Sequence, residues 1–283
     1  VSVGEANQTS DYETMHRSQN EAGYASDLYV GKDAKAFLKG LWPDFNVARA
    51  DCVLHEKPSG YAGTHTAVSG LASKCRQWGV DLRTGVEVQG YETTAGSVAG
   101  VLTNRGTIKA DVVVICAGAW VPKHWQWLGK PPTLDLHYPD GGVARRQDMW
   151  TFWRLLEGEV YLDGTSYRTK DDRDPPVLHV ELMNTPVVTE DGRTFADQHF
   201  YTYVRYAAER VGQPGVQGGT IPIKLGPEAV LDPYGHQNPQ YQADAWFADY
   251  YCATLAYLMD RFKGCRRLFK ERPNGGIGAF TPD

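Results

Sequence analysis

Two stretches in the first third of the chain place apolar residues at helical spacing. One begins at Asp33 and ends before Pro43, a residue that cannot continue a helix. The other runs from Thr64 to Trp78 and is followed by Gly79, which suits the left-handed conformation that ends many helices. Both stretches are therefore predicted to be amphipathic helices.

Strand patterns alternate with these helices up to residue 116. The run from Val112 to Ile115 is apolar at every position, which is typical of a strand covered on both faces, as in a parallel sheet. Small residues follow it, and ligands of open α/β sheets lie at such carboxyl ends of strands. Four other strands are predicted before this run, at 51–56, 80–82, 86–91 and 98–103, and Ile108 leads into it.

Residues 131–235 have a different pattern. Strand-like pieces rich in aromatic residues and valine follow one another with turns and no helices between most of them, which favours an antiparallel sheet. These pieces are 134–138, 150–156, 159–162, 177–183, 200–206 and 220–225. A long helix is predicted at 240–262, and a glycine-rich turn at 274–278.

The predicted fold class is therefore mixed α/β. We expect residues 46–128 and 263–283 to form an incomplete, doubly wound domain. Residues 129–239 are expected to form an antiparallel domain, and 240–262 a connecting helix. Residues 1–45, which are polar for most of their length, are predicted to be an irregular and partly helical lead-in.

Composition narrows the class of partner. The chain has 283 residues, of which 42% are hydrophobic, so a substantial core can form. Its net charge is −5 and it has no long basic run, so no nucleic-acid partner is indicated. No apolar run is long enough to span a bilayer, and no membrane partner is expected. The five cysteines are far apart and lack metal-ligand spacing, which favours reduced cysteines and a cytoplasmic protein without a metal. Oligomeric state stays open.

Three stretches resemble the FAD-dependent D-amino-acid oxidase superfamily, especially its sarcosine and dimethylglycine oxidase branch. They are the helix 67–79 with Gly85-Val86-Glu87-Val88, the strand pair 106–116 with the following Ala117-Gly118-Ala119-Trp120, and the terminal Thr281-Pro282-Asp283. The second stretch is the most specific of the three. The resemblance implies an FAD cofactor and a flavin-dependent oxidoreductase. It makes residues 46–128 and 263–283 the partial FAD-binding domain and residues 129–239 the substrate domain.

The resemblance also implies cofactor contacts. It places the Val88 backbone against the adenine, lines the FAD cleft with Ala117, Gly118 and Trp120, and brings the turn containing Gly276 and Ile277 to the isoalloxazine. Some sarcosine oxidases attach flavin through a cysteine at the position that Gly276 occupies here, so FAD is expected to bind non-covalently.

The family's G-x-G-x-x-G unit for the FAD pyrophosphate is not in this sequence. By the resemblance it would precede Val1, and the family continues past a segment like 281–283. Both ends are thus expected to be cut. Alone, the chain is expected not to bind FAD tightly.

Candidate substrate residues lie in the aromatic-rich region. Tyr201, Tyr203 and Arg205 alternate along one predicted strand and so share a face, where an arginine beside tyrosines could bind a carboxylate. The alternative is a solvent-facing strand surface. His179, two residues from a glutamate, is a candidate catalytic group or a structural histidine. Lys224 resembles a lysine that holds a water near flavin in related oxidases, or it is an ordinary exposed lysine.

The sequence therefore predicts a flavin-dependent oxidation of a C–N bond in a small amine or amino acid. The candidate catalytic residues are Lys224, Tyr203 and His179, with Arg205 and Tyr201 for substrate binding. Two alternatives stay open. One is another flavin-dependent branch, a hydroxylase or dehydrogenase, and the other is a non-catalytic module that does not bind FAD by itself.

Overall fold

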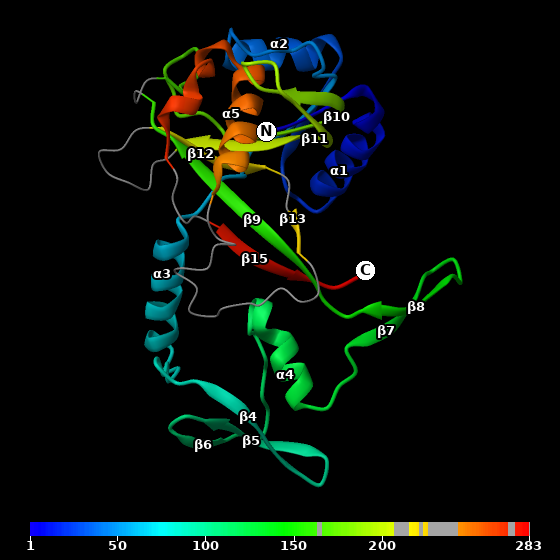
Figure 1. Ribbon diagram of the computed structural model, residues 1–283, viewed down its shortest axis with the longest axis vertical. Coiled ribbons are helices and arrows are strands. Elements are labelled where there is room, and N and C mark those ends of the chain that lie inside the picture. The colour runs from blue at the N-terminus through cyan, green and yellow to red at the C-terminus, as the bar shows by residue number, and fades with distance from the viewer. Residues whose placement is uncertain (163–165, 207–214, 221–222, 226–242, 271–274, 283) are drawn as a thin grey trace. The chain divides into compact units, whose positions relative to one another are not determined.

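The computed structural model describes residues 1–162, 166–206, 215–220, 223–225, 243–270 and 275–282 (Figure 1). The chain is mixed α/β and divides into two compact units. The first comprises Val1–Tyr61, Leu155–Pro222 and His236–Gly276, and the second Ala62–Arg154, Ile223–Gly235 and Ile277–Asp283. The domain boundaries expected above rest on sequence pattern and stay a prediction.

The first unit is built on a large, mainly antiparallel sheet. Its strands follow the order β9-β12-β11-β10-β1-β3-β2, and only the β1–β10 pair is parallel among these neighbours. The bounds are β9 Thr151–Val160, β12 Val216–Thr220, β11 Thr194–Tyr206, β10 Leu178–Val188, β1 Ser2–Gly4, β3 Cys52–Glu56 and β2 Ser26–Val30. Phe269–Lys270 (β14) and Gly275–Phe280 (β15) also pair with β9.

Alternation along the strands divides this sheet into two faces. In the first part of β10 the even positions Leu178, Val180 and Leu182 are buried in the main core, as are Phe200 and Val204 of β11. Helix α5 (Ala245–Leu258) packs on this apolar face (Figure 1). His179 and Glu181 of β10 and the odd positions 201–205 of β11 therefore point to the opposite face, where polar groups can lie. The register shift between Leu182 and Val187 ends this alternation, and Val187 is buried.

Two more helices flank the β3 end of the sheet. On α2 (Lys32–Leu41), Ala34 and Leu38 are fully buried in the main core together with Val53. On α1 (Thr9–Glu21), Tyr12 packs against Cys52 and Leu54 in a separate cluster. Since neighbouring residues of β3 point to opposite faces, α1 and α2 cover opposite sides of this strand.

The second unit contains α3 (Thr64–Gln77), a three-stranded antiparallel sheet, the short helix α4 (Val121–Trp127) and a hairpin. The sheet order is β4-β5-β6, with bounds Val88–Thr94, Ser97–Thr103 and Gly106–Lys109, and the hairpin pairs β7 (Thr133–His137) with β8 (Val143–Asp148). The β4–β5 turn uses Ala95 and Gly96, both with positive φ, 52° and 81°. That geometry matches the right-handed twist of the two strands.

The predicted buried strand at 112–115 was wrong. The segment is not a strand, and Val112 and Val114 are 79% and 78% exposed. No strand pairs with it among the described residues, so neither its backbone nor its outer face is covered. Helix α3 forms where predicted and ends at a Gly79 with φ of 80°, but its Leu71 is 66% exposed.

Other expected elements also differ. Residues 80–82 form no strand, the glycine-rich segment from 275 onward is strand β15, and 150–156 with 159–162 merge into the single strand β9. The lead-in, predicted to be irregular and partly helical, contains helix α1 and also the strands β1 and β2, which were not predicted. The helix expected at 240–262 is α5, which ends at Leu258. Residues 240–242, 274 and 283 lie outside the described part of the chain.

Candidate functional site

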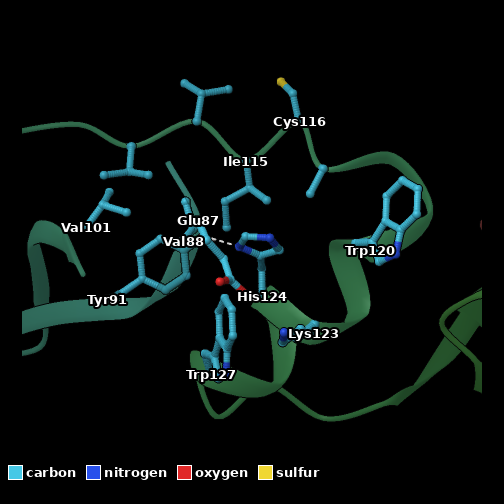
Figure 2. A pocket seen from close by; sticks show the side chains of 13 residues that line it. Glu87, Val88, Tyr91, Val101, Ile115, Cys116, Trp120, Lys123, His124 and Trp127 are labelled. Atoms are coloured by element: carbon cyan, nitrogen blue, oxygen red, sulfur yellow. Dashed lines mark hydrogen bonds between the residues drawn. The ribbon is translucent and has the colours of Figure 1, made fainter. Parts of the chain in front are cut away.

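A cavity of about 430 Å³ lies within the second unit (Figure 2). Its walls come from β4, β5, α4 and the extended segment 113–117. Along that segment, Ile115 points into the cavity and Cys116 points away (Figure 2). The same alternation that exposes Val112 and Val114 therefore gives the cavity one apolar wall.

A hydrogen-bonded pair forms part of the opposite wall. The Tyr91 hydroxyl lies 2.6 Å from Nδ1 of His124, and Figure 2 marks this contact with a dashed line. Burial lowers the pKa of His124, and the nearby charge of Lys123 lowers it further. Burial also raises the pKa of Tyr91. A neutral imidazole can accept the tyrosine proton, so both groups are satisfied without a net charge.

Aromatic packing completes this wall. Trp127 lies edge-to-face with His124, with ring centroids 5.0 Å apart. The ammonium of Lys123 lies 5.1 Å from the centre of the Trp127 ring. One polar and positively charged edge thus borders a mainly aromatic and aliphatic hollow.

These features fit part of a flavin adenine dinucleotide. Aromatic and aliphatic walls with a few polar groups are the usual lining of cofactor sites, and a planar heteroaromatic ring suits such a hollow. Val88, Ala117 and Trp120, expected to contact FAD, all line this cavity. Gly118 follows Ala117 directly and begins a short 3₁₀ helix with φ of 53°.

A second group of candidates gathers in the first unit, on the sheet face opposite α5. Three residues in register form one row across neighbouring strands: Tyr203 pairs with His179 of β10 on one side and with Gly219 of β12 on the other. The His179 and Tyr203 rings stack, with centroids 5.5 Å apart. Gly219 pairs in turn with Glu157 of β9. We call this the polar face, and it also carries Tyr201, Arg205 and Gln217.

Gly219 makes room for the Tyr203 ring. A Cβ at this position would lie 2.7 Å from Cε1 of Tyr203 and 2.6 Å from the Leu156 carbonyl oxygen. With no side chain in the way, the ring lies across β12 and the Tyr203 hydroxyl donates to Oε1 of Glu157 at 2.5 Å. Burial raises the pKa of Tyr203, and the charge of Glu157 and this hydrogen bond raise it further.

Glu157 also ends a chain of hydrogen bonds that begins at Arg205. The Arg205 guanidinium donates to Oε1 of Gln217 at 2.8 Å, and Nε2 of Gln217 donates to Oε2 of Glu157 at 2.6 Å. Arg205 is 9% exposed and its guanidinium lies 4.5 Å from the centre of the Tyr61 ring. A cation and a carboxylate are therefore held on one face by a single amide between them.

Two further groups border this network. Burial lowers the pKa of His179, so its imidazole favours the neutral form. Burial raises the pKa of Tyr201, and the charge of Glu181, the residue opposite it on β10, raises it further. Glu181 in turn lies 3.3 Å from Nε2 of His199.

The structure thus brings together four of the five expected catalytic and substrate residues. Lys224 is the exception: it lies on β13 (Ile223–Lys224), is exposed, and pairs with Trp153 in the second unit. Gly276 and Ile277 lie on β15 and are not among the residues that line the cavity. The roles assigned to these residues stay predictions.

Sequence reasoning missed Glu157, Gln217, Tyr91 and His124. Glu157 fell in the gap between two predicted strands, although it continues the alternation of β9. Gln217 precedes a pair of glycines that read as a loop. Tyr91 and His124 are far apart in the chain, and no spacing rule connects them.

Two searches restricted to the described residues bear on partners. No cluster of three or more His, Cys, Asp or Glu side chains there could hold a metal ion. No helix in the same part of the chain has both the length and the apolar character that crossing a bilayer requires.

Comparisons with known proteins agree with the fold. Residues 3–184 match the family described as FAD dependent oxidoreductase. A D-amino acid dehydrogenase from Phenylobacterium zucineum is 46% identical over 109 residues, covering 32% of this chain and 25% of that protein. One from Chromohalobacter salexigens is 39% identical over 70 residues, covering 24% of this chain and 17% of that protein.

Solved structures show the same fold. L-proline dehydrogenase from P. horikoshii aligns with all of this chain at a TM-score of 0.62 and 16% identity, and glycine oxidase from Geobacillus kaustophilus does so at 0.58 and 14%. The chain covers 60% and 59% of these two proteins. It therefore spans only part of the length of the relatives it matches. Because the family match covers more than half of the sequence, the chain belongs to the family of FAD-dependent oxidoreductases.

Proposed function

We propose that this chain takes part in the FAD-dependent oxidation of a C–N bond in an amine or amino acid, with amino acids as the favoured substrates. The observation that carries the proposal is the polar face of the first unit. Arg205, Tyr203 and His179 lie there within one hydrogen-bonded and stacked group. The names of the relatives support the substrate class, since they act on D-amino acids, L-proline and glycine.

Each residue has a proposed task. The Arg205 guanidinium would bind the substrate carboxylate, because a planar cation with several N–H donors matches a carboxylate in charge and shape. Tyr61, packed on the guanidinium, and Gln217, which accepts from it, would hold its orientation. Neutral His179 and the Tyr203 ring would form one wall of the substrate site.

FAD supplies the hydride acceptor when bound, so the protein needs no nucleophile for this reaction. Val88, Ala117 and Trp120, with the aromatic wall at Trp127, would hold an adenosine or flavin ring in the cavity of the second unit. The apolar lining would exclude water from the bound ring.

A flavin-reduction assay tests the proposal. The chain, with FAD in excess, is mixed without oxygen with D-alanine, L-proline, glycine or sarcosine. We expect at least one of them to bleach the flavin absorbance, and Arg205→Met to raise the substrate concentration needed by tenfold or more, as expected for the loss of a charge-assisted hydrogen bond. Absorbance that no amine or amino acid bleaches would contradict the proposal and favour a different flavin-dependent branch.

The same assay addresses the electron acceptor. Reoxidation by dioxygen would indicate an oxidase, and reoxidation only by a dye or quinone would indicate a dehydrogenase.

We further propose a reducing compartment such as the cytoplasm, because all five cysteines are free and three of them, Cys52, Cys252 and Cys265, are buried.

A further inference from the structure

We infer that Glu157, which no sequence pattern singled out, fixes the direction of hydrogen bonding at the polar face, so that the Tyr203 oxygen accepts a hydrogen bond from a substrate ammonium. Glu157 is a positioning residue in this scheme, and Tyr203 is the group that touches the substrate. The inference rests on the proposed function for its choice of ligand.

The direction follows from what each group can donate or accept. A guanidinium has only donors and an ionised carboxylate has only acceptors. Arg205 donates to Gln217 and Glu157 accepts from it, so the amide of Gln217 between them can point only one way. Its oxygen accepts from Arg205, and its nitrogen donates to Glu157.

The other carboxylate oxygen of Glu157 settles the role of Tyr203. That oxygen accepts the tyrosine hydroxyl proton at 2.5 Å. A hydroxyl has one proton and two lone pairs. With the proton committed to Glu157, the Tyr203 oxygen can offer only lone pairs to anything else that reaches it, and the best partner for lone pairs is a positively charged N–H group.

The position of this acceptor matches a zwitterionic ligand. Tyr203 and Arg205 are two residues apart on β11, roughly 7 Å along the strand, and point to the same face. One offers an acceptor and the other a cation with donors. An α-amino acid presents the complementary groups, an ammonium and a carboxylate, on the same carbon atom. The face would therefore select the zwitterion over a ligand that has the carboxylate alone.

Replacing Glu157 by glutamine would break this order while keeping the shape of the side chain. An amide has one acceptor oxygen, but two donors, Tyr203 and Gln217, now point at it. Either the Tyr203 proton turns outward, or Gln217 rotates and loses its bond with Arg205. In both cases the preference for an ammonium is weakened.

The test measures binding to the 283-residue chain by titration calorimetry, without FAD and without turnover. The two probes are D-alanine, which has both charges, and N-acetyl-D-alanine, which keeps the carboxylate and lacks the ammonium. We expect wild type to bind both, and Glu157→Gln and Tyr203→Phe each to weaken D-alanine binding about tenfold while changing N-acetyl-D-alanine binding less than twofold, because a hydrogen bond to a charged group is lost only with the first probe.

Glu159→Gln is the matched control. Glu159 lies two residues along the same strand, and its carboxylate accepts from the Tyr161 hydroxyl at 3.0 Å and not from Tyr203. It should leave the affinities for both probes unchanged. Equal losses for the two probes in Glu157→Gln, or no loss in a variant whose circular dichroism matches wild type, would overturn the inference. So would a folded wild-type chain that does not bind D-alanine. If the variants show the expected affinities for the two probes but no amino acid reduces the flavin, the inferred direction of hydrogen bonding is supported and the proposed oxidation is contradicted.

Discussion

At the scale of single residues, the polar face depends on glycines, which leave space, as much as on its polar side chains. Glycines at 218 and 219 let β12 pass beneath the Tyr203 ring and against the backbone of β11. The ring can then reach Glu157 across an intervening strand. The glycine pair can be seen in the sequence. The need for it cannot, because Tyr203 and Glu157, which make use of the space, lie on two other strands distant in the chain.

Gly219→Ala should therefore destabilise the chain by about 1–3 kcal/mol, the usual cost of forcing an extra methyl group into a packed site. The added Cβ would meet the Tyr203 ring and the Leu156 carbonyl oxygen. Urea unfolding followed by circular dichroism measures the change. Gly40→Ala, in helix α2 of the same unit and with no atom near the added Cβ, should be neutral or stabilise by about 0.5–1 kcal/mol. Two substitutions of equal effect would contradict the packing argument.

Gly276 leads to a prediction about flavin attachment. A thioether to flavin needs a cysteine sulfur, and glycine at this position has none. We expect any FAD bound by the protein to be released by acid precipitation and to remain in the supernatant. Yellow colour that stays with the precipitated polypeptide would mean that another residue forms the link.

At the scale of elements, the sequence predicted structure well where periodicity and burial agree. Helix α2 and strand β3 appear within one residue of their expected bounds, because their apolar positions are buried against each other. The odd face of β11 was also predicted, since alternation alone places Tyr201, Tyr203 and Arg205 together. The prediction for residues 112–115 was wrong because a continuous apolar run shows only that a strand there could be buried. It does not show whether a partner strand is available to it.

The ion pair between Asp44 and Arg261 links elements that sequence reasoning treated separately. Asp44 follows α2, and Arg261 lies in the 3₁₀ helix Asp260–Phe262 after α5. The guanidinium contacts both carboxylate oxygens, at 2.5 and 2.9 Å, and donates to the carbonyl oxygens of Ser166 and Arg168. Burial acts to raise the pKa of Asp44, but the hydrogen bonds and charge of Arg261 outweigh it, and the pKa is lowered.

Asp44→Asn should cost about 1–3 kcal/mol of unfolding free energy at neutral pH, because Arg261 loses an ionised acceptor in a partly buried site. The folded pKa of Asp44 lies below its unfolded value near 4, so the pair stabilises the fold above about pH 4 and this contribution is lost as the pH falls through the folded pKa. The difference between wild type and the variant should thus shrink as the pH drops below 4, as measured by urea unfolding at several pH values. Asp260→Asn, at a carboxylate that is 73% exposed and paired with Lys263, should change little at any pH. A difference that is constant with pH would exclude the ion pair as its source.

At the scale of the whole molecule, the candidate functional residues are divided between two units. The first holds the polar face and most of the buried core, and the second holds the aromatic cavity. Sequence reasoning found candidates in both because strand alternation is local, and it missed the hydrogen-bonding partners because they depend on the order of strands in the sheet. The second unit also exposes large apolar side chains, among them Leu71, Trp78, Val112 and Val114. Isolated exposed apolar residues are common, but several in one unit predict association or aggregation of the chain at high concentration.

Val114→Thr tests whether Val114 is exposed, as in the structure, or buried in a strand covered on both faces, as the sequence predicted. In a strand covered on both faces, this change would bury a hydroxyl and cost about 1–3 kcal/mol. With Val114 78% exposed, we expect the free energy of unfolding to change by less than about 0.5 kcal/mol. The double variant Val112→Thr/Val114→Thr removes apolar surface that the described residues leave uncovered. It should therefore lower the fluorescence of a dye that binds apolar surfaces and reduce self-association in sedimentation experiments. Val180→Thr, on the fully buried face of β10, provides the contrast and should lose stability by the larger amount. If Val114→Thr destabilises the chain as much as Val180→Thr does, then the segment 112–115 is covered in solution, and its covering must come from a surface that pairs with it or packs on its outer face.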